Sequence, residues 1–123
     1  MSAAICLVFG AVLALPTDHL TLAWTHSVQK TLWQEDYRVE AGRLVLTEAR
    51  IQSSGAGMDP PPGAVLEGGF WHYRPEIAPL PELQIAESHF ASGYDLCWDG
   101  SCHRLAELFG RPVEGTVTIR PCA

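Results

Sequence analysis

Basic residues are scarce in this chain of 123 residues. Eight Lys and Arg face fourteen Asp and Glu, which gives a formal net charge of -6, and no basic run occurs. Nucleic acids and anionic membrane surfaces attract proteins through clustered cationic side chains. The composition therefore argues against a nucleic-acid partner and against electrostatic attachment to a membrane surface.

A long apolar run is also missing. The run over 2–16 is shorter than the roughly 20 residues that a transmembrane helix needs, so no transmembrane segment is expected. It has the length of a signal-peptide core, but a signal peptide begins with cations, and the first cation here is Lys30. Because Gly10 divides the run into two pieces of strand length, we expect two buried strands, with a cleaved signal as the alternative.

Familiar catalytic signatures are absent as well. The sequence has no G-x-S-x-G elbow, no P-loop, no H-E-x-x-H and no G-x-G-x-x-G. We therefore predict no catalytic residue, no cofactor and no metal site. A binding protein is favoured over an enzyme.

The chain does contain many short segments of alternating polarity, separated by turn signals. This pattern predicts an all-β fold: a single compact antiparallel β-sandwich or barrel with at most one short helix. At this length, and with 47% apolar residues, one domain over 1–123 is expected. The expected strands are 5–9, 11–15, 20–26, 33–39, 43–51, 65–66, 69–73, 83–86, 93–98, 101–105 and 113–120, with one helical turn at 106–109.

The segment from Cys97 to Cys102 predicts a tight hairpin. Asp99-Gly100 at its centre favours a two-residue type I′ turn, in which both central residues have positive φ. Such a turn places Cys97 opposite Cys102 in a non-hydrogen-bonded pair, with Cα atoms about 4.5 Å apart. That spacing is at the short end of the disulfide range, so a cross-strand disulfide is the first choice.

The other two cysteines, Cys6 and Cys122, would then join the first strand to the last. The alternatives are four free thiols, or a zinc site made by Cys97, Cys102, His103 and Cys122, although the ligand spacing fits a zinc site poorly. Disulfides predict a periplasmic or otherwise extracytoplasmic protein. With reduced cysteines the protein would be cytoplasmic.

Side chains that could take part in binding or in acid–base chemistry are concentrated in the stretch 24–35. If a loop of six residues, 27–32, joins two strands, the apolar residues on both strands share one face. The expected pairs are His26 with Trp33, Trp24 with Glu35, Leu22 with Tyr37 and Leu20 with Val39. His26, Trp33 and Glu35 then meet at one end of the sheet, beside a loop that carries Lys30.

These four residues form the predicted ligand-binding site. Two glycines of the loop 53–63, Gly55 and Gly57, are added because their backbone amides could hold an anion. A carboxylate beside His26 would raise the pKa of the imidazole. An alternative is a small hydrolase that uses His26 and Glu35 as acid and base, and a second alternative is a purely structural domain.

The same stretch carries a family resemblance. Trp24-Thr25-His26-Ser27-Val28-Gln29-Lys30, followed by Trp33-x-Glu35, by Leu44-Val45-Leu46-Thr47-Glu48-Ala49-Arg50 and by Gly55-Ala56-Gly57-Met58, resembles the bacterial domain-of-unknown-function family 1850. The N-terminal strand with Cys6 and the hairpin with Cys97 and Cys102 also resemble the family, so the resemblance spans nearly the whole domain. Gln29 departs from the pattern, because the family usually has Glu there.

The resemblance implies a role but no activity. Members of the family are often encoded near TAXI-type TRAP transporters, which take up small organic acids with an extracytoplasmic solute-binding protein. An accessory protein that binds a TRAP transporter component or a small-molecule carboxylate is therefore expected. The resemblance also implies that the N-terminal run belongs to the domain and is not cleaved.

Overall fold

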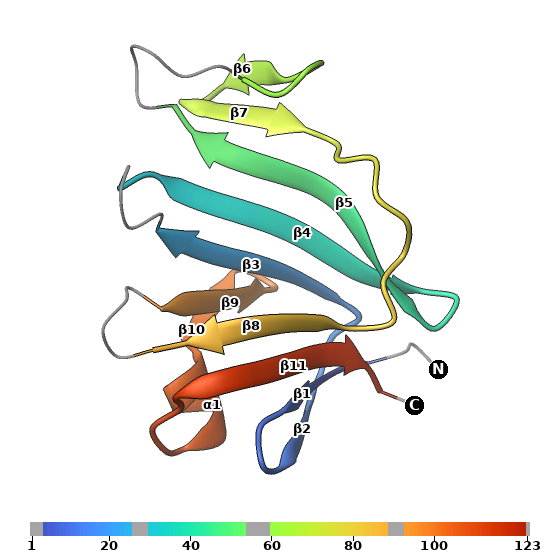
Figure 1. Ribbon diagram of the computed structural model, residues 1–123, viewed down its shortest axis with the longest axis vertical. Helices are drawn as coiled ribbons and strands as arrows, with labels where there is room; N and C mark the ends of the chain where they lie inside the picture. The colour runs from blue at the N-terminus through green and yellow to red at the C-terminus, as the bar shows by residue number, and fades with distance from the viewer. Residues whose placement is uncertain (1–3, 26–29, 54–59, 89–92, 123) are drawn as a thin grey trace.

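The computed structural model describes residues 4–25, 30–53, 60–88 and 93–122 (Figure 1). These residues form eleven strands and one short helix. In chain order they are β1 (Ile5–Val8), β2 (Val12–Leu15), β3 (His19–Thr25), β4 (Leu32–Glu40), β5 (Arg43–Gln52), β6 (Val65–Glu67), β7 (Phe70–Tyr73), β8 (Leu83–Glu87), β9 (Tyr94–Trp98), β10 (Ser101–Arg104), α1 (Leu105–Phe109) and β11 (Gly115–Pro121).

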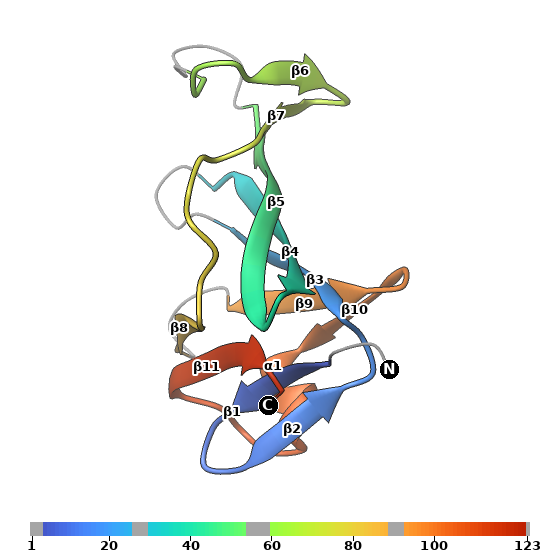
Figure 2. The ribbon, with the colours of Figure 1, turned by 90° about the vertical axis from the view of Figure 1, so that its right-hand side faces the viewer.

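The strands make two antiparallel sheets that pack together, as predicted. The smaller sheet has the order β2-β1-β11-β8, and the larger has the order β10-β9-β3-β4-β5-β7-β6. Seen from the side, the larger sheet extends well beyond the smaller one at the end where β6 and β7 lie (Figure 2). The connection from β7 to β8 runs beside the larger sheet, and Leu80 exchanges both backbone hydrogen bonds with Leu44 of β5.

The core lies between the two sheets. It is built from alternate residues of the strands, because successive side chains of a strand point to opposite faces. Its fully buried members are Ile5, Leu7, Leu20, Leu22, Leu44, Leu96, Leu105, Val117 and Ile119. Burying one such side chain stabilises the fold by about 1.5–3 kcal/mol. Helix α1 supplies Leu105 and ends at Phe109, where the C-cap Gly110 has the left-handed φ of 69°. No helix in the described part of the chain is long and apolar enough to cross a membrane.

The N-terminal run forms two strands, as expected, but only the first is buried. β1 lies between β2 and β11, whereas β2 is at the edge of the smaller sheet. Val12 of β2 is 60% exposed. The prediction of a second buried strand is therefore wrong, because apolar content alone does not distinguish an edge strand from a central one.

Both expected disulfides are present, Cys97–Cys102 and Cys6–Cys122, and no described cysteine is free. Asp99 and Gly100 have φ values of 50° and 81°, which confirms the turn with two positive φ angles. Cys97 lies opposite Cys102 at a Cα distance of 4.0 Å. All four sulfur atoms are in disulfides, which overturns the free-thiol and zinc alternatives.

The register of β3 and β4 differs from the expected one. Trp24 lies opposite Trp33, and Leu22 lies opposite Glu35. The pairing is displaced by two residues, since Trp33 lies opposite Trp24 and not opposite His26 as expected. A displacement by an even number leaves the residues on the predicted faces but gives them other partners. The observed register stacks the rings of Trp24 and Trp33 and lets the Thr21 hydroxyl donate to Asp36 at 2.7 Å.

Candidate functional site

Aromatic side chains line up across the larger sheet at the end where β3 finishes and β4 begins. The pairings place Tyr94 of β9, Trp24 of β3, Trp33 of β4, Ile51 of β5 and Trp71 of β7 in one row. Cross-strand partners share a face, so these five side chains lie on the face that also carries the core. We call Tyr94, Trp24, Trp33 and Trp71 the aromatic row.

Three rings of the aromatic row contact one another. The centroids of Trp24 and Trp33 are 6.1 Å apart with nearly parallel planes, and those of Trp24 and Tyr94 are 5.8 Å apart. The indole N–H of Trp33 donates to the hydroxyl of Thr31 at 3.3 Å, and Thr31 is buried. All three rings remain partly exposed. The three rings form a surface that is fixed by these contacts and that solvent still reaches.

Glu35 lies on the same face, in the next row of cross-strand partners, two residues after Trp33 on β4. Its neighbours across the sheet, Leu22 and Ala49, are both 2% exposed. The Tyr37 hydroxyl donates a hydrogen bond of 2.9 Å to Oε1 of Glu35. Burial raises the pKa of the Glu35 carboxyl, and the hydrogen bond from Tyr37 offsets only part of that rise. Among the described residues, no basic side chain pairs with this carboxyl.

The charge of Glu35 affects three phenols on the larger sheet. The pKa of Tyr37 is raised by burial and by the charge and hydrogen bond of Glu35. The pKa values of Tyr73 and Tyr94 are also raised, first by burial and then by nearby negative charge that includes Glu35. Glu35 is therefore close enough to each phenol to raise its pKa, and it is a half-buried acid in an aromatic setting.

Glu35→Gln is expected to stabilise the protein at neutral pH by up to about 1 kcal/mol, because it removes a charge that burial disfavours while keeping an oxygen for Tyr37. The wild-type protein loses stability as the pH rises from the ordinary carboxyl pKa of 4.5 to the raised folded value, since the folded state holds more protons in that window. Urea unfolding from pH 4 to pH 8 should show the gain of the variant growing with pH. A constant difference would contradict this.

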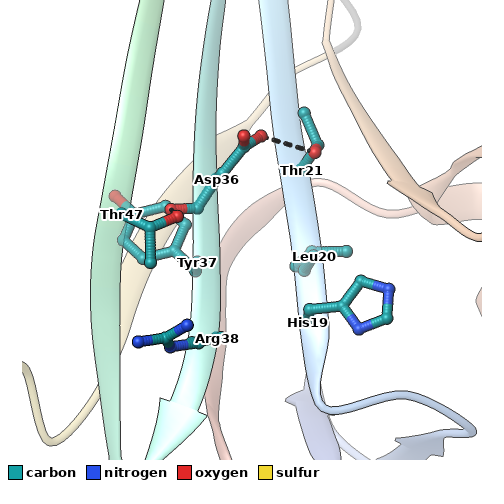
Figure 3. A pocket seen from close by; sticks show the side chains of 7 residues that line it. All are labelled: His19, Leu20, Thr21, Asp36, Tyr37, Arg38 and Thr47. Atoms are coloured by element: carbon teal, nitrogen blue, oxygen red, sulfur yellow. Dashed lines mark hydrogen bonds between the residues drawn. The ribbon is translucent and has the colours of Figure 1, made fainter. Parts of the chain in front are cut away.

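The opposite face of the same strands is polar. Arg50 donates to both carboxylate oxygens of Asp36, at 2.7 and 2.8 Å, and also to Glu48 and to Gln34. A groove of about 280 Å³ lies on this side (Figure 3). It is lined by His19, Leu20, Thr21, Asp36, Tyr37, Arg38 and Thr47.

The polar groups of this groove already have partners within the fold. The Thr21 hydroxyl donates to Asp36, and the Thr47 hydroxyl donates to the Asp36 carbonyl at 3.2 Å. His19 lies between Asp18 and Asp99, at 3.1 and 3.2 Å, and the hydrogen bond with Asp18 contributes most to raising its pKa. The hydrogen bonds around the groove thus stabilise the sheet, and the contact of His19 with Asp99 joins β3 to the β9–β10 hairpin.

The structure brings together part of the site predicted from sequence. Trp33 and Glu35 lie on one face, as expected. Lys30 is exposed, has a φ of 55° and makes no ion pair with Glu35. His26, Gly55 and Gly57 lie outside the described residues, so the acid–base pair of His26 and Glu35 stays a prediction.

The segments that carry the sequence signature do leave the sheet at a common end. Thr25 ends β3 opposite Leu32, which begins β4. The backbone N–H of Leu32 donates to the side chain of Gln52, the last residue of β5, at 3.0 Å. Thr25 and Gln52, the last residues of β3 and β5, therefore both lie beside the aromatic row.

Five members of this site were not among the residues predicted from sequence: Trp24, which was expected only as a strand residue, Trp71, Tyr73, Tyr94, and Tyr37 as the partner of Glu35. Alternation within β4 could have placed Tyr37 beside Glu35, since the two are separated by two residues on one strand. Trp71, Tyr73 and Tyr94 join the site through the pairing of β7 with β5 and of β9 with β3, which connects each of them to a residue 20 or more positions away in sequence.

The fold and this face define a small two-sheet antiparallel β-protein whose larger sheet carries an aromatic end with a half-buried carboxyl. The chain belongs to the family described as a domain of unknown function, DUF1850, whose model matches residues 20–105. The matched range contains the aromatic row, Glu35 and the Cys97–Cys102 hairpin, and leaves Cys6 and Cys122 outside. Neither the curated proteins nor the solved structures gave a match.

Proposed function

We propose that this protein is a binding module, accessory to TAXI-type TRAP uptake of small organic acids, whose ligand or partner docks on the aromatic row and Glu35. The observation that carries the proposal is the half-buried Glu35 carboxyl behind a row of partly exposed rings. Burying an acid without a basic partner costs stability. A protein that keeps such a group at the end of a sheet, beside three partly exposed rings, gains most if a second molecule provides the missing basic partner.

Two occupants were expected from sequence, a transporter component and a small-molecule carboxylate. The electrostatics of Glu35 favour the transporter component, because a free carboxylate would place a second negative charge beside the first. The family's association with TRAP transporters supports the same partner. Among proteins of such a system, the solute-binding component is soluble and extracytoplasmic, so it is the partner we propose.

The proposed location is the periplasm or another extracytoplasmic compartment. Two disulfides support it, since disulfides persist in oxidising compartments and are rare in the cytosol. This location would place the protein together with the solute-binding component.

The test is binding of the purified chain to the purified solute-binding component of the TAXI-type transporter from the same organism. We expect Trp33→Leu and Glu35→Ala each to weaken binding by about tenfold or more, as is typical when a central contact is removed. Isothermal titration calorimetry measures the affinity, and circular dichroism checks that each variant is folded.

Glu40→Gln is the matched control. Glu40 lies at the other end of β4, is exposed and pairs with Arg38, so its loss should leave the affinity unchanged. Full binding by folded Trp33→Leu and Glu35→Ala proteins would refute docking at this site. Loss of binding in the control to the same degree would do so as well.

A further inference from the structure

The carboxyl of Glu35 has one oxygen engaged and one open. Oε1 accepts from Tyr37, whereas no described residue donates to Oε2. Among the buried polar side-chain atoms of the described residues, only Oε1 of Glu87 lacks a hydrogen-bond partner. Oε2 of Glu35 is therefore not fully buried, and solvent reaches it at least in part.

The surroundings of Oε2 suit a positive charge. The rings of Trp24, Trp33 and Tyr94 lie in the next row of the same face. Aromatic rings attract ammonium and guanidinium groups through their negative faces, and tryptophan does so most strongly. The chain as a whole carries a net charge of -6, which adds a long-range attraction for cations.

From this juxtaposition we infer that the group bound beside Glu35 is a protonated amine, paired with the carboxylate and packed on the rings of Trp24 and Trp33. The inference rests on the proposed function, because it names the chemistry that the docking site accepts. It does not require that the whole ligand be a cation. A small amine and a lysine side chain of the solute-binding component offer the same group.

The pairing explains why burial of Glu35 is tolerated. In the free protein the carboxyl is held in aromatic surroundings, and burial raises its pKa. An ammonium group at Oε2 would favour the ionised form and lower that pKa again. Binding of an amine should therefore release protons and should become tighter as the pH rises through the pKa of Glu35. A carboxylic acid bound to a neutral Glu35 would show the opposite pH dependence.

The experiment compares three probes of the same carbon number: n-butylammonium, n-butanol and n-butyrate. Binding is followed by tryptophan fluorescence and by the NMR signals of the indole N–H groups at pH 7. We expect saturable binding of n-butylammonium, weaker binding of n-butanol by about ten- to a hundredfold, which is the usual strength of one charge-assisted hydrogen bond, and no binding of n-butyrate.

Glu35→Gln keeps the shape of the side chain and should reduce n-butylammonium binding to the level of n-butanol. Glu40→Gln on the same strand is the matched control and should bind as the wild-type protein does. Preference for n-butyrate, or unchanged n-butylammonium binding by Glu35→Gln, would overturn the inference.

A second arm separates the two sources of the amine. Nα-acetyl-lysine methylamide, which presents a lysine side chain, is titrated beside n-butylammonium, and each is tested as a competitor of the solute-binding component. Competition by both probes supports a lysine of that component as the bound group. Binding of both probes without competition assigns the site to a small amine and removes the proposed partner from it. If the component binds through Trp33 and Glu35 but neither probe binds, the proposed function stands and the amine inference fails.

Discussion

Replacement of both Cys6 and Cys122 by alanine is expected to lower the free energy of unfolding by roughly 4–5 kcal/mol, the chain-entropy value for a loop of about 100 residues. This disulfide joins residues 116 positions apart, so it restricts almost the entire unfolded chain. It also holds the first strand of the smaller sheet beside the last, where the N–H of Cys122 donates to the Ala4 carbonyl. Urea unfolding of the oxidised proteins measures the loss.

The matched comparison is the double replacement of Cys97 and Cys102 by alanine. These cysteines are only five positions apart, and the same model gives less than about 3 kcal/mol for so short a loop. The hairpin also keeps its own ladder, its Asp99-Gly100 turn and the packing of Trp98 on His103 without the disulfide. An equal loss from both pairs, or a greater loss from the hairpin pair, would contradict the prediction.

The contrast between these two pairs shows which kinds of structure the sequence encodes locally. Asp99-Gly100 specifies its turn by the backbone preferences of two residues, so the hairpin and the Cys97–Cys102 pairing followed directly. The Cys6–Cys122 pairing followed only because two cysteines remained. Like the hairpin turn, the strands could be identified locally. The alternation of polar and apolar residues along a strand involves only that strand's own residues.

The register of β3 against β4 was harder to predict, for a physical reason. Alternation fixes which residues share a face, but every displacement that keeps the faces satisfies it equally well. The stack of Trp24 on Trp33 and the hydrogen bond from Thr21 to Asp36 distinguish the observed register. Both are cross-strand contacts, which the pattern of a single strand does not contain.

The candidate site, too, could be predicted from sequence only where its residues belong to one strand. Trp33 and Glu35 were found because they lie two residues apart on one strand. Tyr94 and Tyr73 belong to it through the strand order β9-β3-β4-β5-β7, in which β9 pairs with β3 across about 70 residues of chain. Non-local pairing of this kind is decided by the packing of the whole sheet. Glu35 and Trp33 could therefore be predicted from the sequence, whereas the rings that β7 and β9 contribute could not.

The second large effect concerns Asp36, the neighbour of Glu35 in sequence, whose side chain lies on the opposite face. Burial alone would raise the pKa of Asp36, but hydrogen bonds from Arg50 and Thr21 outweigh it and hold the pKa below its ordinary value of 3.8. The side chains of Arg50 and Asp36 are 17% and 31% exposed, so solvent screens the pair only in part. Asp36→Asn is expected to lower the free energy of unfolding by about 2 kcal/mol at neutral pH, because Arg50 loses the carboxylate to which it donates two hydrogen bonds.

The matched control for Asp36→Asn is Asp95→Asn. Asp95 pairs with Arg104 at 3.2 Å, and both side chains are well exposed, so its loss should change stability by no more than about 1 kcal/mol. Equal effects of the two substitutions would contradict the assignment of Asp36 to a partly buried network. Retention of the full Asp36 effect at pH 3 would contradict its electrostatic origin.

The pH dependence of Asp36→Asn should be opposite in sign to that of Glu35→Gln. The pKa of Asp36 is lower in the folded state, so its contribution is fully present above pH 3.8 and is lost as the pH falls through the lowered folded value. The pKa of Glu35 is raised, so its charge costs stability at neutral pH and costs nothing in acid. Urea unfolding of both variants from pH 3 to pH 8 therefore tests whether adjacent carboxyls serve different ends: one that stabilises the sheet, and one kept in an unfavourable setting that a bound cation would relieve.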